Sequence, residues 1–204
     1  TACRISPILA MDHYALGFTY SFEDGFHEGD YDGAIAGCRA EIRIKPDNAW
    51  AYYNLGIALN SKGDFDGAIA EFRTVIRLQP DYAGAHSNLG YALSLKGDWD
   101  GAMAEYRTAI RLQPDDAEAH MALGYALRQK GELDGAIAEY GTAIRLQPDD
   151  AAAHINLGYA LSHKGDLDGA MAEWRTAIRL RPDHAEAHMA LGNALENKGD
   201  RDGA

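Results

Sequence analysis

Apolar residues recur along the chain at the spacing of one face of an α-helix. Between Pro80 and Pro114, the first such set is Ala85, Leu89, Ala92 and Leu93, and the second is Ala102, Tyr106, Ala109 and Ile110. Lys96 and Gly97 separate the sets, and a cation followed by a glycine favours the end of a helix. The pattern predicts two helices, the first starting at Asp81 and the second running from Asp98 to Leu112, each capped by its aspartate.

The same pattern returns every 34 residues. The prolines mark the interval at Pro46, Pro80, Pro114, Pro148 and Pro182. A repeat of this length predicts stacked supersecondary units, each burying its apolar face against its neighbours. We expect a single all-α domain over residues 1–204, with repeats at about 10–48, 49–82, 83–116, 117–150 and 151–184 and a partial repeat at 185–204.

Both ends of the array depart from the regular unit. Near the N-terminus the repeat is five residues too long, and residues 22–26 form the expected insertion. At the other end, a helix from about Asp183 to Lys198 has no second helix after it. We expect either a fragment of a longer protein or an apolar end that another molecule covers.

Small and large residues alternate where the two helices of a unit must meet. Gly90 and Ala102 are small, and Tyr106 fills the space around them. Cys38 takes the place that an aromatic residue holds in the later repeats, so we expect a buried apolar thiol there.

Several of these positions resemble the tetratricopeptide repeat family. The resemblance rests on Leu89-Gly90, Leu93, Ala102, Tyr106, Ala109 and Pro114. It implies a solenoid of antiparallel helical hairpins forming a right-handed superhelix, and a non-enzymatic scaffold for protein–protein interaction. The later repeats differ from the family in carrying a histidine where it often has a large apolar residue.

The resemblance also implies a partner-binding groove lined by the first helix of each hairpin. The residues expected to bind an extended peptide or a helix are Tyr53, Asn54, Ile57, Ser87, Asn88, Tyr91, Met121, Tyr125, Arg128, Ile155, Asn156 and Tyr159. The asparagines resemble the ladder that grips a peptide backbone in O-linked N-acetylglucosamine transferases, although Ala122 interrupts it. The alternative is that Tyr91, Tyr125 and Tyr159 only pack between hairpins. The lysines and arginine of a carboxylate clamp for chaperone tails are missing from this face.

No residue pattern predicts a metal, a cofactor or a catalytic site. His86, His120, His154 and His188 are one repeat apart, too far to converge on a zinc ion, and are expected to pack between helices. The paired aspartates are interpreted as helix caps, not as a calcium loop. Glu105 with Arg111 and Glu173 with Arg179 are interpreted as a solvated charge pattern.

The composition narrows the choice of partner. A net charge of −12 argues against nucleic acid, whose phosphates need a basic surface, and no apolar run is long enough for a membrane span. A cytoplasmic protein is expected, with a lipoprotein remnant at Cys3 as a minor alternative. Besides the scaffold, two alternatives stay open: self-assembly through the open C-terminal end, and a substrate-recruiting arm of a larger enzyme.

Overall fold

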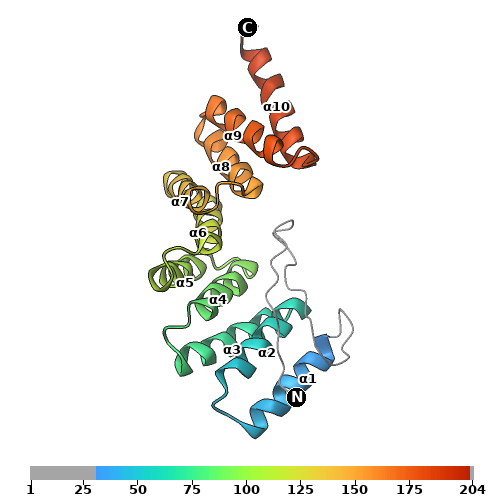
Figure 1. The fold of residues 1–204 in the computed structure, drawn as a ribbon, viewed down its shortest axis with the longest axis vertical. Coiled ribbons are helices and arrows are strands. Elements are labelled where there is room, and N and C mark those ends of the chain that lie inside the picture. Colours follow the sequence, from blue (N-terminus) through green and yellow to red (C-terminus); the bar gives the residue numbers. More distant parts are fainter. Residues whose placement is uncertain (1–30, 203–204) are drawn as a thin grey trace. The chain divides into compact units, whose positions relative to one another are not determined.

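The structure is a computed structural model that describes residues 31–202 (Figure 1). Within these residues it contains ten α-helices and no strand: α1 (Tyr31–Ile44), α2 (Ala49–Lys62), α3 (Phe65–Leu78), α4 (Ala83–Leu95), α5 (Trp99–Leu112), α6 (Ala117–Gln129), α7 (Leu133–Leu146), α8 (Ala151–Lys164), α9 (Leu167–Leu180) and α10 (Ala185–Asp202). The expected insertion at residues 22–26, the first helix of the first repeat and Cys3 lie outside this range.

The chain divides into two compact units, and each is described by itself. Unit 1 spans residues 1–114 and contains α1 to α5; unit 2 spans residues 115–204 and contains α6 to α10. In unit 1, α2 packs on α3 and α4 on α5; in unit 2, α6 packs on α7 and α8 on α9. The predicted all-α fold of helical hairpins is thereby confirmed, whereas a single solenoid over residues 1–204 stays a prediction.

A glycine in the left-handed region turns the chain inside each hairpin. Gly63, Gly97, Gly131 and Gly165 have φ angles of 88°, 78°, 79° and 94°. Side chains with a Cβ rarely adopt such angles, so glycine allows the first helix to end and the second to start within a few residues.

Aspartates cap the second helices α3, α5 and α9, as predicted for Asp98, but the first helix after Pro80 starts one residue later than expected. Asp98 accepts a hydrogen bond from the backbone N–H of Gly101, at 3.0 Å. The prediction for Asp81 is wrong, because Asp81 lies in the turn that follows Pro80. The N-cap of α4 is Tyr82, which provides no side-chain cap, and Asp116 holds the equivalent position before α6.

The hairpin cores are built from a glycine facing an aromatic ring. The second-helix rings Phe72, Tyr106, Tyr140 and Trp174 are all at most 4% exposed. Facing them are Gly56, Gly90, Gly124 and Gly158, where an added Cβ would lie only 2.4–2.8 Å from a ring atom. The two helices therefore approach closely only because this side chain is absent. In α1, Cys38 is buried and free of a disulfide, which confirms the predicted buried thiol.

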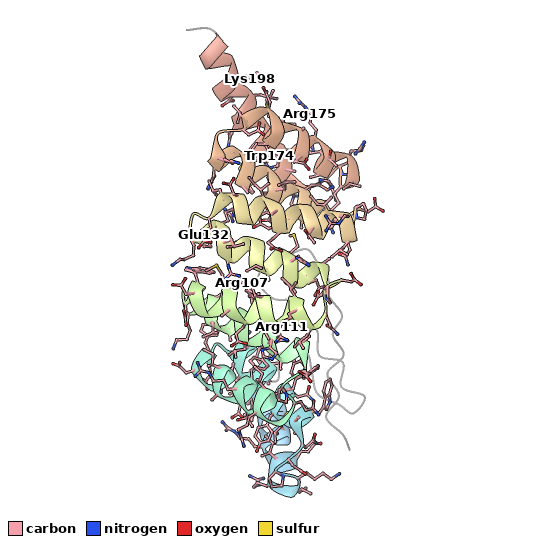
Figure 2. The ribbon with its side chains drawn as sticks, turned by 90° about the vertical axis from the view of Figure 1, so that its left-hand side faces the viewer. Arg107, Arg111, Glu132, Trp174, Arg175 and Lys198 are labelled. Atoms are coloured by element: carbon pink, nitrogen blue, oxygen red, sulfur yellow. The ribbon has the colours of Figure 1, made fainter. Side chains whose placement is uncertain are left out.

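Exposed ion pairs link the ends of α2, α4, α8 and α10 to the preceding second helix. Lys62 Nζ lies 2.5 Å from Asp32 Oδ1, Lys164 Nζ 2.5 Å from Asp134 Oδ1 and Lys198 Nζ 2.5 Å from Asp168 Oδ1, and Lys96 pairs with Asp66. Exposed arginines also lie on the second helices, and Figure 2 shows Arg107 and Arg111 on α5 and Arg175 on α9. The first helices α2, α4, α6 and α8 contain fewer Asp, Glu, Lys and Arg residues than the second helices do, and α4 contains none.

Candidate functional site

Three aromatic rings form a cluster on the first helices of unit 1. Trp50 and Tyr53 on α2 stack with their centroids 5.3 Å apart, and the ring of Tyr82 lies 5.1 Å from that of Tyr53. Trp50 remains 39% exposed. Burial, and then the neighbouring Tyr82, raises the pKa of Tyr53 far above its usual value. The hydroxyl of Tyr53 therefore stays protonated and can take part in hydrogen bonds.

The asparagine amides of the first helices are held by hydrogen bonds within the protein. Asn88 Nδ2 donates to the carbonyl oxygen of Gly84 at 2.8 Å and to the hydroxyl of Tyr53 at 3.0 Å, which ties α4 to α2. Asn156 Nδ2 donates to the carbonyl oxygen of Ala152 at 3.0 Å. Because an amide has two N–H groups, both of those of Asn88 are used. Its Oδ1 atom has no donor among residues 31–202, so this oxygen is the atom that could accept an N–H from a peptide.

In unit 2 an arginine lies against two tyrosine rings. The guanidinium carbon of Arg128 on α6 is 5.2 Å from the ring centroid of Tyr125 and 6.0 Å from that of Tyr159 on α8. Tyr159 in turn meets the ring of Trp174 edge to face, at 5.5 Å. Both the cation–π and the edge-to-face geometry are favourable, so these side chains hold one another in place.

Acidic side chains surround the start of the first helices in unit 2. Burial raises the pKa of Glu118, and repulsion from Asp116 and Asp150 raises it further. Burial also raises the pKa of Asp150, against the backbone N–H groups of Ala152 and Ala153 that lower it. Unit 2 thus combines Arg128 with carboxylates on the first helices, whereas α4 of unit 1 contains no Asp, Glu, Lys or Arg.

Each of three histidines is bonded to a glutamate of the second helix in its own hairpin. The Nδ1 to Oε2 distance is 2.7 Å for His86 with Glu105, 2.6 Å for His120 with Glu139 and 2.6 Å for His154 with Glu173. The histidines are 7–8% exposed. The prediction that histidines pack between helices is confirmed for these three, but it is wrong for His188, which is exposed. The interpretation of Glu105 and Glu173 as solvated charges is also wrong. Among residues 31–202 no three His, Cys, Asp or Glu side chains are grouped so as to hold a metal ion.

Sequence comparison assigns these hairpins to a family. The family model described as "TPR repeat" matches residues 124–165 and 160–199, and the one described as "Tetratricopeptide repeat" matches residues 53–117 and 88–143. Together the matches run from residue 53 to residue 199. The chain belongs to the tetratricopeptide repeat family. No curated protein matches the sequence.

Solved structures of other TPR proteins are similar to this one. The crystal structure of MamA is 28% identical with a TM-score of 0.72, covering 78% of this chain and 92% of that chain. YrrB, described as a TPR protein with an unusual peptide-binding site, is 25% identical with a TM-score of 0.70, covering 78% and 82%. TTC0263, a thermophilic TPR protein of Thermus thermophilus, is 25% identical with a TM-score of 0.65, covering 82% and 91%. A TPR fold implies a role as a protein–protein interaction scaffold, and proteins of this family are in general not enzymes.

The TPR hairpins place the twelve predicted partner-binding residues in two groups. Four are buried: Asn54, Ile57, Met121 and Ile155. Eight are half-buried: Tyr53, Ser87, Asn88, Tyr91, Tyr125, Arg128, Asn156 and Tyr159. The structure brings Tyr53 to Asn88, and Tyr125 and Tyr159 to Arg128. We call the half-buried residues of unit 1 (Tyr53, Ser87, Asn88, Tyr91) face 1 and those of unit 2 (Tyr125, Arg128, Asn156, Tyr159) face 2.

Sequence reasoning missed two features of this TPR protein. Trp50 and Tyr82 extend face 1, and their aromatic character at the start of a first helix was the available signal. The histidine–glutamate pairs were missed because each residue was interpreted by itself, although the two recur together 19 residues apart in three repeats. As the sequence predicts, no helix within residues 31–202 has the length and apolarity that crossing a membrane requires.

Proposed function

We propose that this TPR protein is a scaffold that holds an extended peptide or a partner helix against face 1 or against face 2. The observation that carries the proposal is the half-buried state of Tyr53, Tyr91, Tyr125 and Tyr159 on successive first helices. A half-buried ring keeps part of its surface accessible to a ligand. Such rings offer contact area at a small entropic cost, since their neighbours already hold them.

The two faces favour different ligand chemistry. Face 1 lies on helices almost without charge and offers the rings of Trp50 and Tyr53 with the Oδ1 atom of Asn88. It suits apolar side chains and the backbone N–H groups of an extended peptide. Face 2 adds the cation of Arg128, so it suits a ligand that carries a negative charge. The unusual peptide-binding site described for YrrB supports the same use of this fold.

Selection from a random peptide library tests the proposal without a known partner. A phage-displayed library of twelve-residue peptides is selected on the 204-residue chain, and an enriched peptide is titrated by calorimetry. Asn88→Ala and Tyr125→Ala each probe one face, and Arg107→Ala on the exposed side of α5 is the matched control. We expect at least one face variant to weaken the peptide about tenfold or more, with the control unchanged. Equal affinities for all three variants would contradict the proposal.

Self-association through α10 is a second candidate function. This helix exposes Met189 at 62% and Leu195 at 47%, and a Cβ added at Gly192 would have no neighbour within 4 Å. In the other first helices the equivalent glycine faces an aromatic ring of the second helix. The corresponding surface of α10 is therefore an apolar surface on which a helix of a second copy could pack. Sedimentation velocity over a concentration series would show dimers that Met189→Ser with Leu195→Ser abolishes. A monomer at all concentrations would exclude this function.

A further inference from the structure

The ring of His154 is held between two oxygen atoms from different elements. Its Nδ1 atom lies 2.6 Å from Glu173 Oε2 on α9, and its Nε2 atom lies 3.2 Å from the carbonyl oxygen of Pro148 in the turn after α7. His86 is held in the same way, 2.7 Å from Glu105 Oε2 and 2.9 Å from the carbonyl oxygen of Pro80. We call each group of histidine, glutamate and proline carbonyl a clamp, because it ties a first helix to the second helix and to the preceding turn.

Both hydrogen bonds of a clamp can exist together only if the histidine–glutamate pair holds one proton more than a neutral imidazole and an ionised carboxylate do. A carbonyl oxygen only accepts, so Nε2 must carry a hydrogen. The Nδ1 atom then faces a carboxylate oxygen, and this contact also needs a hydrogen between the two atoms. A neutral imidazole beside an ionised glutamate lacks it, and two lone pairs would face each other at 2.6 Å. The ring must then give up one of its two partners.

We propose that the His154 clamp is a pH-sensitive device that fastens the hairpin of α8 and α9 when it is protonated and loosens this hairpin when the proton is lost. The charged groups that act on His154 are Glu173 from α9 and Asp150 at the N-cap of α8 itself. In the part of the chain that the structure describes, α7 and α10 bring no other charged group within ion-pair distance of its ring. Glu173 and Asp150 are both negative, so both favour the charged imidazolium.

The direction of the pH effect follows from the same geometry. The hydrogen bond to Glu173 raises the pKa of His154 against the opposing effect of burial, and the Pro148 carbonyl and Asp150 raise it further. The folded state therefore binds the proton more tightly than the unfolded state does. The stabilisation is complete below the ordinary histidine pKa of about 6.5 and is lost as the pH rises through the folded-state value. Each released proton raises the opening equilibrium constant by up to about tenfold per pH unit.

The first described hairpin contains a version of the clamp without an imidazole. Tyr52 stands where the later repeats have histidine, and its hydroxyl donates to the carbonyl oxygen of Pro46 at 3.1 Å. A tyrosine thus keeps the bond to the turn without a second acid–base equilibrium near neutral pH. His154→Tyr copies this natural arrangement. Glu173→Gln is the complementary variant, because an amide can pair with either form of the imidazole.

Imidazole ¹⁵N chemical shifts of the 204-residue chain test the proton directly. At pH 6.5 we expect both nitrogens of His154 to carry a hydrogen in the wild type, and only Nε2 to carry one in Glu173→Gln. His188 gives an internal reference, since its Nε2 lies 2.8 Å from the Pro182 carbonyl oxygen and no described carboxylate bonds its Nδ1. A neutral His154 in the wild type at pH 6.5 would overturn the proposal.

Hydrogen exchange tests whether protonation of the His154 clamp controls the opening of the hairpin of α8 and α9. Opening constants of amides in α8 and α9, corrected for intrinsic exchange rates, are compared at pH 6 and pH 8. We expect them to rise severalfold or more in the wild type and to stay level in His154→Tyr and Glu173→Gln. The same rise in both variants, or no rise in the wild type, contradicts the proposal. If His154→Tyr does not fold, the Glu173→Gln measurement decides, because this variant retains the bond between the helices.

Discussion

A Cβ atom placed on Gly158 would lie 2.4 Å from Nε1 of Trp174. The same nitrogen donates a hydrogen bond to the carbonyl oxygen of Ile155 at 3.3 Å, so the indole is held at this position from two directions. The hairpin of α8 and α9 has no room for any side chain larger than hydrogen here. This steric requirement explains why glycine recurs at the same place in every described hairpin that has a buried ring.

We expect Gly158→Ala to lower the free energy of unfolding by about 1–3 kcal/mol, because the methyl group forces the indole out of its seat. Gly141→Ala is the matched control, since a Cβ at Gly141 on α7 meets nothing within 4 Å. That variant should gain about 0.5–1 kcal/mol from helix propensity alone. Urea unfolding of both variants measures the difference. Similar stabilities for the two variants would show that the close contact between Gly158 and Trp174 does not limit packing.

The lysine–aspartate ion pairs should contribute little to stability. Lys164 Nζ lies 2.5 Å from Asp134 Oδ1, but the two side chains are 51% and 83% exposed. Water and salt screen such a pair, so Lys164→Gln should cost less than about 1 kcal/mol. Urea unfolding at low salt and at about 1 M salt tests this, and the small difference should vanish at high salt. A larger loss would mean that Lys164 acts through packing of its stem.

Asn88→Ala should lower both stability and ligand affinity. The amide ties α4 to α2 through Tyr53, so its loss should cost about 1 kcal/mol in the free energy of unfolding. Asn156→Ala should cost less, since its bond stays within α8. Urea unfolding orders the two variants, and calorimetry with a selected peptide measures the affinity. An Asn88→Ala protein as stable as the wild type would contradict the role of the Asn88–Tyr53 bond.

Tyr159 should couple stability to alkaline pH. Burial, followed by repulsion from Glu186 and a hydrogen bond to it, raises the pKa of Tyr159 to about 12, although Arg128 lowers it. A phenol with a raised pKa in the folded state stabilises below the ordinary value of about 10, and this stabilisation is lost as the pH rises from 10 through 12. Tyr159→Phe should therefore lose less stability than the wild type between pH 9 and pH 11. Unfolding at the two pH values, with absorbance at 295 nm to follow ionisation, checks this expectation.

Much of the fold follows from local pattern. The helices, their 34-residue period and the buried positions Phe72, Tyr106 and Cys38 could be predicted, because each repeat states the same requirements again. The residue that caps α4 could not be predicted, since either residue after Pro80 is compatible with a helix start. The sequence pattern also did not predict that Asn54, Ile57, Met121 and Ile155 are buried. A helix rotation of a few tens of degrees decides whether such side chains face a ligand or a neighbouring helix.

The sequence by itself determined the helical hairpins, the glycine opposite each aromatic ring and the membership of the TPR family, because these depend on spacing along one chain. Only the tertiary structure decided which side chains meet across helices. Glu173 and His154 are 19 residues apart, and nothing local distinguishes a solvated glutamate from one that is hydrogen-bonded to a buried imidazole. That distinction arises when two helices pack and remove water from between the two groups.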